Sequence, residues 1–349
     1  MKQKSIIVAP LNWGIGHATR CIPIIQELLK MGLDVIIASD GNALELLKLQ
    51  FPDLKYHNLP SYHIKYGKKN ALLPFIYRWP ILLWAISAEH LALKKIIKTS
   101  HCVGIISDNR LGLYHHSIPS YYMTHQVNMK APLSWLSWLG NTIHHFFMKK
   151  FEGVWIPDYN DSYLGGQLSY QSKSIKTTFI NPLSRLEKVA GSAIIRDFIV
   201  VLSGIEPQRT HLEKILRNKL EKSDYTYLIV KGKLGAKNLD TNTVDFLGSD
   251  ELALEISQSK YVISRAGYSS IMDWDKLESK ALLIPTPGQS EQEYLAKHLL
   301  SHPLFTSQNQ GEINLSKAIK RLNNKSDHTT DHNHRFNLSS FLKNTFTKR

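Results

Sequence analysis

The feature that most constrains the fold is an alternation of short apolar runs with amphipathic segments, which begins near residue 5 and starts again near residue 197. Short runs of Val, Ile and Leu, as at residues 5–10, are typical of parallel strands that are buried on both faces. Between them lie segments such as 18–31, whose apolar residues recur every three or four positions, as in an amphipathic helix. This order predicts an α/β protein with parallel sheets covered by helices.

Two such units fit into the 349 residues, and we expect the boundary near Asn181-Pro182. Strands are expected at 5–10, 33–38, 102–107, 118–124, 197–202, 225–230, 245–247, 261–264 and 281–285. Helices are expected at 18–31, 42–50, 210–220, 250–258, 270–277 and 292–300. We therefore predict two doubly wound Rossmann-like domains, at residues 1–182 and 183–322. Residues 323–349 form a polar tail, in which 336–347 has the pattern of a short amphipathic helix.

Charge is distributed unevenly along the chain. The 43 Lys and Arg residues against 29 Asp and Glu give a net charge of +14, which indicates an anionic partner: nucleic acid, an anionic membrane or a phosphorylated substrate. Residues 61–150 contain 11 basic residues, 13 aromatic residues and only two acidic residues, Glu89 and Asp108. This mixture is typical of a segment on an anionic membrane, although it also suits a solvated face over an ordinary core. No nucleic-acid-binding motif is visible, so we expect no nucleic acid as a partner.

The same segment predicts where the protein works. The apolar stretch 71–86 is shorter than the ~20 residues that span a bilayer, and two prolines and an arginine interrupt it. We therefore expect 71–86 and 131–150 to contact the membrane surface without crossing it. The apolar start at 6–10 is too short for a signal peptide, and two cysteines exclude a disulfide framework. The prediction is a cytoplasmic protein that is peripherally associated with the inner face of the membrane.

Loops that follow strands are the places where a doubly wound sheet binds ligands. The first of them, Gly14-Ile15-Gly16-His17, leads into a helix and so favours an anionic ligand close to the backbone. In the second half, Gly267-Tyr268-Ser269-Ser270 also opens a helix, with Asp273 in its first turn. Asp273 either complements the helix dipole or binds a ribose. Asp108, which either caps a turn or takes part in chemistry, and the pair His125-Gln126 follow two further strands.

Five short motifs occur in a fixed order along the chain. They are Gly14-Ile15-Gly16-His17, Asn181-Pro182-Leu183-Ser184-Arg185, Ser203-Gly204, Ser264-Arg265-Ala266-Gly267 with Asp273, and Gln292-Glu293-Tyr294. In this order they resemble the motifs of inverting glycosyltransferases of the GT-B fold, family 28, which includes the MurG-type UDP-N-acetylglucosaminyltransferases. The sequence departs from the family pattern at Asn12-Trp13, where glycines are usual, at Asp273, which replaces Glu, and at Glu293, which replaces Gln. These departures concern the donor sugar more than the fold.

The resemblance implies two Rossmann-like domains that face each other across a cleft, and a nucleotide-sugar donor with UDP as the expected nucleotide. The donor-binding residues that it implies are Gly14, Ile15, Gly16, Arg185, Ser203, Gly204, Leu247, Arg265, Gly267, Tyr268, Ser269, Ser270, Asp273, Gln292 and Glu293. Within this set Arg185, the 203–204 loop and the helix start at 268–270 would neutralise the diphosphate. Asp273 would hold the ribose, and the backbone of Leu247 would hold the base.

The family reaction is a one-step displacement at the anomeric carbon, in which a base removes the proton of the acceptor hydroxyl. His17 is the first candidate for this base, because an imidazole titrates near neutral pH. Asp108 is the second candidate, or it orients His17. His125 and Gln126 are expected to line the acceptor cleft. Neither half has a DxD-type metal pair after a strand, so we expect no metal and no cofactor, with the UDP-sugar as co-substrate. Three tail histidines are interpreted as solvated: His328, His332 and His334.

The expected acceptor is a hydroxyl of a lipid-linked compound or a glycolipid, because such an acceptor would be presented at the membrane face. Two other functions fit the same architecture. A UDP-sugar epimerase would need extra carboxylates in the cleft of the first half, which is poor in acids. A non-catalytic module that binds a nucleotide sugar or a membrane would need none of the predicted chemistry.

Overall fold

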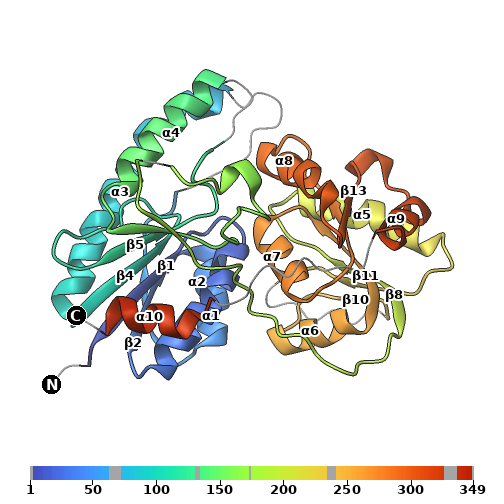
Figure 1. Cartoon of the computed structure of the whole chain (residues 1–349), viewed down its shortest axis with the longest axis horizontal. Coiled ribbons are helices and arrows are strands. Elements are labelled where there is room, and N and C mark those ends of the chain that lie inside the picture. The colour runs from blue at the N-terminus through green and yellow to red at the C-terminus, as the bar shows by residue number, and fades with distance from the viewer. Residues whose placement is uncertain are drawn as a thin grey trace.

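The computed structural model describes residues 3–62, 72–129, 134–172, 174–233, 241–325 and 336–347, with the backbone alone at 72–80. The chain forms two α/β units that lie side by side, with the N-terminal unit at the left of Figure 1 and the C-terminal unit at the right. In each unit helices cover a parallel sheet, and separate clusters of buried apolar side chains fill its two faces.

Within the described residues, the N-terminal sheet has seven parallel strands in the order β3-β2-β1-β4-β5-β6-β7. The strands are β1 (Ser5–Pro10), β2 (Asp34–Ser39), β3 (Lys55–Asn58), β4 (Cys102–Asp108), β5 (Ser120–Met123), β6 (Gly153–Ile156) and β7 (Thr177–Phe179). All six residues of β1 are buried, as expected for a central parallel strand. The strand order reverses between β1 and β4, where Pro10 pairs with Asp108. Such a reversal is where doubly wound sheets bind ligands.

The helices of this unit are α1 (Gly16–Lys30), α2 (Gly41–Gln50), α3 (Leu72–Thr99), α4 (Ser134–Met148) and the 3-10 turn η1 (Gly166–Leu168). The last helix of the chain, α10 (Leu338–Phe346), also packs here, beside α1 in Figure 1. Its Phe341 and Phe346 rings lie edge-on to Trp155, with centroids 5.0 and 6.2 Å away. The C-terminal end of the chain therefore helps to close the N-terminal core.

In the described part of the C-terminal unit, six parallel strands follow the order β10-β9-β8-β11-β12-β13. They are β8 (Arg196–Val201), β9 (Tyr227–Val230), β10 (Thr243–Val244), β11 (Ser259–Arg265), β12 (Ala281–Ile284) and β13 (Phe305–Ser307). The helices are α5 (Gln208–Glu221), α6 (Ser249–Ser257), α7 (Tyr268–Lys276), α8 (Ser290–His298) and α9 (Leu315–Asn323), with η2 (Leu299–Ser301) and η3 (Gln310–Glu312). This sheet reverses between β8 and β11.

The prediction of an α/β protein with two doubly wound parallel sheets is confirmed. The expected strand at 245–247 is wrong, because pairing with β9 ends at Val244. Asp245 instead leaves the strand edge, and its carboxylate lies 3.2 Å from Lys231 Nζ. The domain boundaries at 182 and 322 stay predictions.

Helix α3 is not among the predicted helices, because its two prolines interrupt the apolar pattern. The backbone is nevertheless helical from Leu72 through Pro80 to Thr99. No helix in the ranges given above is long and apolar enough to cross a membrane.

Candidate active site

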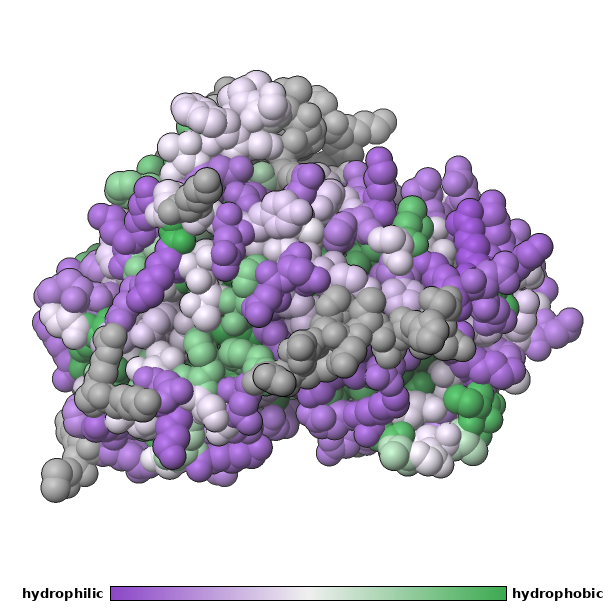
Figure 2. Space-filling model, viewed as in Figure 1, coloured by the Kyte–Doolittle hydropathy of each residue, from purple (hydrophilic) through white to green (hydrophobic). Residues whose placement is uncertain are grey.

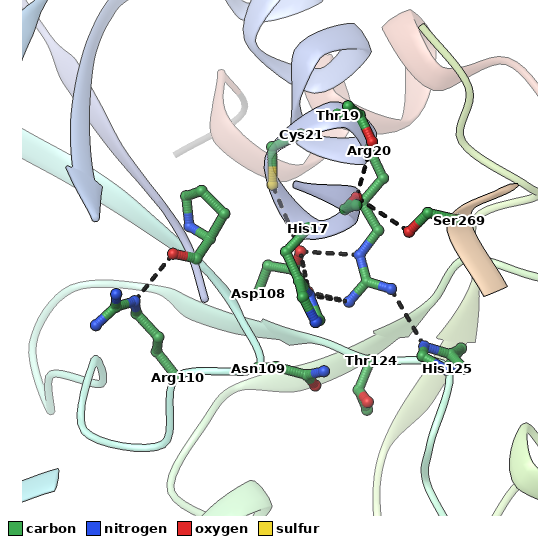
Figure 3. Close-up of polar contacts among 12 residues, drawn as sticks. His17, Thr19, Arg20, Cys21, Asp108, Asn109, Arg110, Thr124, His125 and Ser269 are labelled. Atoms are coloured by element: carbon green, nitrogen blue, oxygen red, sulfur yellow. Dashed lines mark hydrogen bonds and ion pairs between the residues drawn. The ribbon is translucent and has the colours of Figure 1, made fainter. Parts of the chain in front are cut away.

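The two units present the carboxyl ends of their central strands to each other. Ser269 Oγ, in the first turn of α7, donates a hydrogen bond to the main-chain oxygen of Gly16 at 3.0 Å, so that α7 meets the start of α1 (Figure 3). Gly16 permits this approach, because a Cβ at that position would lie 2.8 Å from Ser269 Oγ. The reversal points of both sheets thus face one region.

Three buried side chains, which we call the His17 cluster, lie at the centre of this region: His17, Arg20 and Asp108 (Figure 3). His17 Nδ1 lies 3.1 Å from Asp108 Oδ2 and 3.0 Å from Arg20 Nη2. Arg20 holds both carboxylate oxygens, through Nε at 2.8 Å from Oδ2 and through Nη2 on Oδ1. His17 and Arg20 both lie on α1, three residues apart, and therefore share one helix face. His17 Nε2 makes no hydrogen bond with any residue that the structure describes.

Electrostatics keep the carboxylate of this cluster ionised. Burial raises the pKa of Asp108, but the charge and hydrogen bonds of Arg20 and His17 outweigh it and lower the pKa to about 2. Two groups lie beside His17 Nδ1: a proton on Nδ1 can donate to Asp108 Oδ2, whereas a lone pair there would accept from Arg20 Nη2. Because Arg20 Nη2 already donates to Asp108 Oδ1, we assign the proton to His17 Nδ1, where it faces the ionised carboxylate. This assignment leaves the lone pair on Nε2. Burial also raises the pKa of the neighbouring Cys21 thiol, which donates to Asp108 and remains protonated. The arrangement can therefore act as a general base.

A second set of buried charges, which we call the Arg110 cluster, lies close by and consists of Arg110, Asp40 and Glu89. Arg110 Nη1 donates to Glu89 Oε1 at 2.6 Å, Nη2 donates to Asp40, and Nε donates to the main-chain oxygen of Pro10 at 2.9 Å. The hydroxyl of Tyr62 donates to Glu89 Oε2 at 2.6 Å. Burial raises the pKa of Glu89 despite Arg110. Since Arg110 and Glu89 are both fully buried, this cluster faces the protein interior.

His125 lies between the two units rather than in an open cleft. Its Nδ1 lies 3.1 Å from Arg20 Nη1, and its Nε2 lies 2.9 Å from Glu291 Oε1 on α8. One ring face stacks on Tyr268, with centroids 4.0 Å apart. The main-chain N–H of Gln126, the other predicted acceptor residue, donates to Thr124 Oγ1 at 3.0 Å. His125 therefore contacts the C-terminal unit, and the role of both residues toward an acceptor stays a prediction.

Predicted donor residues lie in the loops after β8 and β10, on α7, and in the segment before β8. Asp273 lies on α7 beyond its first turn, so its expected place in that turn is wrong, because the helix begins at Tyr268. Gly204, in the loop after β8, has a φ of +96°, a backbone conformation that favours glycine. Asp273 Oδ1 accepts a hydrogen bond from Ser184 Oγ at 2.5 Å, and burial raises the pKa of this carboxyl to about 6. Arg185, which faces the charge of Asp273, has a buried Nε that makes no hydrogen bond with the residues that the structure describes. Leu247 is half-buried against the core of this unit.

The side chains of three other predicted donor residues form hydrogen bonds with main-chain groups of neighbouring loops. The guanidinium of Arg265 is buried and donates to main-chain carbonyls. Gln292 Oε1 accepts from the Thr286 amide at 2.9 Å, and Glu293 Oε1 accepts from the Gly288 amide at 2.8 Å. These side chains shape the loops around the site. Direct contact with a donor stays a prediction for them, as it does for Gly14, Ile15, Ser203, Gly267 and Ser270.

Sequence reasoning missed Arg20, Arg110 and Glu291. A signal for Arg20 existed, because it lies one helical turn after His17 and so shares its face. Glu291 directly precedes the matched Gln292, but only the packing of the two units reveals its partner. The tail histidines His328, His332 and His334 lie outside the described residues. Within those residues, no group of three or more His, Cys, Asp or Glu side chains could hold a metal ion.

Comparisons with known proteins agree with this geometry. Residues 190–345 match the model of the glycosyltransferase family 28 C-terminal domain. An uncharacterized glycosyltransferase of Methanopyrus kandleri is 22% identical over 300 residues, which cover 80% of this chain and 85% of that protein. An uncharacterized glycosyltransferase of Methanosarcina mazei is 23% identical over 313 residues, with 80% and 79% covered.

Solved structures show the same fold over almost the whole length. The crystal structure of Acinetobacter baumannii MurG has a TM-score of 0.57 at 12% identity and covers 99% of this chain and 100% of its own. The spinosyn rhamnosyltransferase SpnG in complex with thymidine diphosphate has a TM-score of 0.61 at 13% identity, with 100% and 96% covered. The glycosyltransferase SnogD from Streptomyces nogalater has a TM-score of 0.65 at 12% identity, with 100% of both chains covered. The fold is therefore GT-B.

Proposed function

Because the chain is a glycosyltransferase with the GT-B fold and a family 28 C-terminal domain, we propose that it transfers a sugar, with inversion, from a nucleoside-diphosphate donor to a hydroxyl of a lipid-linked or glycolipid acceptor. UDP is the nucleotide that we expect. The observation that carries the proposal is the pairing of His17 with an ionised Asp108 at the point where the two units meet.

In the proposed mechanism His17 Nε2 accepts the proton of the acceptor hydroxyl while the hydroxyl oxygen attacks the anomeric carbon. The bond between that carbon and the diphosphate oxygen breaks in the same step, and its electron pair leaves with the diphosphate. Attack from the opposite face inverts the configuration. The imidazolium that forms lies against Asp108, which stabilises its charge and holds the ring in place.

Groups at the start of α7 support binding of the diphosphate. The N-cap residue of α7 is Gly267, which has no side chain to accept from the first main-chain N–H groups of the helix, so these groups can donate to an anion. Arg185 adds a positive charge, and its Nε has no hydrogen-bond partner in the described part of the chain. The carboxyl of Asp273, with a pKa of about 6, is mostly ionised at neutral pH and can accept hydrogen bonds from ribose hydroxyls.

Exposed aromatic side chains on α3 and α4 support a membrane-bound acceptor. Trp84 is 62% exposed, and on α4 Trp135 and Trp138 are 51% and 69% exposed. Figure 2 shows mostly pale rather than purple residues at the upper end of the molecule, where α4 lies in Figure 1. Trp prefers the boundary between water and lipid. We therefore propose that 71–86 and 131–150 attach the protein peripherally to the cytoplasmic membrane face. Residues 71 and 131–133, and the side chains of 72–80, lie outside the described residues.

The alternative of a UDP-sugar epimerase has less support. The carboxylates of Asp40 and Glu89 are held by Arg110, and that of Asp108 is held by Arg20. None of the three is therefore free to serve as the additional acid or base that an epimerase needs.

A donor and acceptor screen tests the proposal. The purified protein is incubated with UDP-, GDP- or dTDP-sugars and a lipid extract, and the products are identified by mass spectrometry, with Asp108→Asn as a matched variant. We expect a lipid product heavier by one sugar residue and release of the nucleoside diphosphate, both reduced in Asp108→Asn. An isomerised donor without a new lipid product, or no reaction with any donor, would contradict the proposal.

Vesicle sedimentation tests the membrane attachment separately. We expect the protein to sediment with anionic vesicles and the double variant Trp135→Ser, Trp138→Ser to remain in the supernatant. Tyr170→Ser is the control, because Tyr170 is 55% exposed and lies outside both segments. Failure of the unaltered protein to bind, together with efficient glycosylation of a water-soluble acceptor, would disprove the attachment.

A further inference from the structure

A line of polar contacts leads from the His17 cluster into the C-terminal unit. Asp108 holds Arg20, Arg20 Nη1 lies 3.1 Å from His125 Nδ1, and His125 Nε2 lies 2.9 Å from Glu291 Oε1. Figure 3 shows Arg20 between Asp108 on one side and His125 on the other. The line therefore connects β4 and α1 of one unit with the start of α8 of the other.

The chemistry of these groups fixes the positions of the protons. A guanidinium can only donate hydrogen bonds, so His125 Nδ1 must be the acceptor of the contact with Arg20. His125 then carries its proton on Nε2 and donates it to Glu291. Burial lowers the pKa of His125, although Glu291 acts in the opposite direction, which agrees with a neutral ring. Arg20 is 1% exposed and His125 is 5% exposed, so water cannot readily replace either contact.

Arg20 uses all three of its nitrogens in this arrangement. Nε and Nη2 hold the two oxygens of Asp108, and Nη1 holds His125. Because a guanidinium is rigid and planar, the place of His125 limits the plane in which Arg20 can hold the carboxylate. Asp108 Oδ2, in turn, is the atom that faces His17 Nδ1. A displacement of His125 or Glu291 is therefore transmitted to the orientation of the base.

We propose that Arg20, His125 and Glu291 are positioning residues that couple contact between the two domains to the correct setting of the His17–Asp108 pair. This inference rests on the proposed function and adds to it: the base is fully set only when α8 of the donor domain is in place. None of the three residues needs to touch the reacting atoms.

A double-mutant cycle separates this role from direct donor contact. We expect Glu291→Gln to lower kcat about tenfold, with the donor KM changed by less than about twofold, and to have no further effect in a His125→Ala background. Equal losses from Glu291→Gln in both backgrounds would overturn the proposal, because a donor-binding Glu291 would act independently of His125. Glu278→Gln is the control, since Glu278 is an exposed partner of Lys188, and it should change neither constant.

Substitutions of Arg20 test the same idea through pH. The charged groups that face His17 are Arg20 on α1, Asp108 on β4 and Glu291 on α8, with the titratable His125 after β5. Arg20→Gln removes a positive charge and leaves Asp108 to stabilise the imidazolium, so the acidic limb of the kcat/KM profile should move up by about one pH unit. Arg20→Lys keeps the positive charge but loses the planar guanidinium that holds both oxygens of Asp108. We therefore expect kcat to fall while the acidic limb of the kcat/KM profile keeps its position. Loss of activity in both variants with an unmoved limb would contradict the proposal.

Nitrogen NMR of labelled histidine in the free protein provides a readout that needs no turnover. We expect His125, assigned through His125→Ala, to be the neutral Nε2–H tautomer between pH 5 and 8 in the unaltered protein. A proton on Nδ1 of His125 would overturn the inference even if the protein is a glycosyltransferase. If no donor reacts at all, the proposed function fails, but this measurement still shows whether His125 accepts from Arg20 and donates to Glu291. The measurement gives the same answer if the buried Arg20 variants do not fold.

Discussion

The His17 cluster and the Arg110 cluster each join a buried arginine to a carboxylate near the carboxyl ends of strands in the N-terminal sheet, yet they differ in which of their polar atoms have partners. Each places a buried arginine on a carboxylate, and these carboxylates are Asp108 and Glu89, the only two acids between residues 61 and 150. In the Arg110 cluster every charged side chain points at a protein partner. In the His17 cluster one atom, His17 Nε2, has no partner among the described residues.

This difference indicates how one chemical motif can serve two purposes. A fully paired set of buried charges fixes loops, and here Arg110 connects the ends of β1 and β2 with α3. A set that ends in an imidazole with one free nitrogen can exchange a proton with a ligand. We therefore expect damage to the Arg110 cluster to appear as lost stability, and damage to the His17 cluster to appear as lost turnover.

The largest expected effect breaks the closed cluster. Arg110→Leu leaves Glu89 and Asp40 buried without their cation, and removal of one partner of a buried ion pair costs about 3–5 kcal/mol of unfolding free energy. Denaturant unfolding, followed by the fluorescence of a tryptophan in the N-terminal unit, measures the change. A variant that keeps its stability but loses turnover would show that this cluster takes part in the chemistry.

A smaller effect sharpens the comparison through pH, because the two carboxyls shift in opposite directions. Asp108 has a lowered pKa of about 2, so its contribution, roughly 2 kcal/mol, is present above the unfolded value near 3.9 and is lost as pH falls toward 2. Glu89 has a raised pKa, so its contribution is present below the unfolded value near 4.3 and is lost as pH rises through the folded value.

Two amide substitutions measure these contributions. As pH rises from 2 to 4, the unfolding free energy of the unaltered protein should increase relative to that of Asp108→Asn. As pH rises above 4, its unfolding free energy should decrease relative to that of Glu89→Gln. If both differences in unfolding free energy change in the same direction as pH rises, the proposed electrostatic contrast between the two clusters is wrong.

The smallest expected effect concerns the contact between the units, on which only the His17 cluster depends. Gly16→Ala places a methyl group 2.8 Å from Ser269 Oγ, and the serine side chain must move. We expect turnover to fall a few-fold with little change in unfolding free energy, because one flexible side chain can adjust at a modest cost. Adding Ser269→Ala should restore part of the turnover. An equal loss in the single and double variants would place the cause elsewhere.

The sequence was sufficient for the central strands of both sheets, including β1, which precedes His17, and β4, which ends at Asp108, because parallel strands buried on both faces leave continuous apolar runs. It also placed Gly16 and Ser269 at helix starts. It missed β3, β6, β7 and β13, whose three or four residues are too few for such a run. It could not place His125 between the units, because stacking on Tyr268 and contact with Glu291 depend on how two separately coded domains meet. Arg20 was overlooked among the many basic residues of the chain, since sequence alone does not distinguish a buried arginine from a solvated one. The strong positive charge pointed to a partner and said little about these two buried guanidinium groups.

The most direct test of the central claim, that His17 is the base of a glycosyl transfer, is the single-turnover rate of sugar transfer by His17→Ala, measured beside its affinity for the nucleoside diphosphate. We predict that transfer slows by about a thousand-fold, as expected for loss of a general base, while affinity and the thermal unfolding midpoint stay close to those of the unaltered protein. Transfer at an undiminished rate by a folded His17→Ala protein would contradict the account.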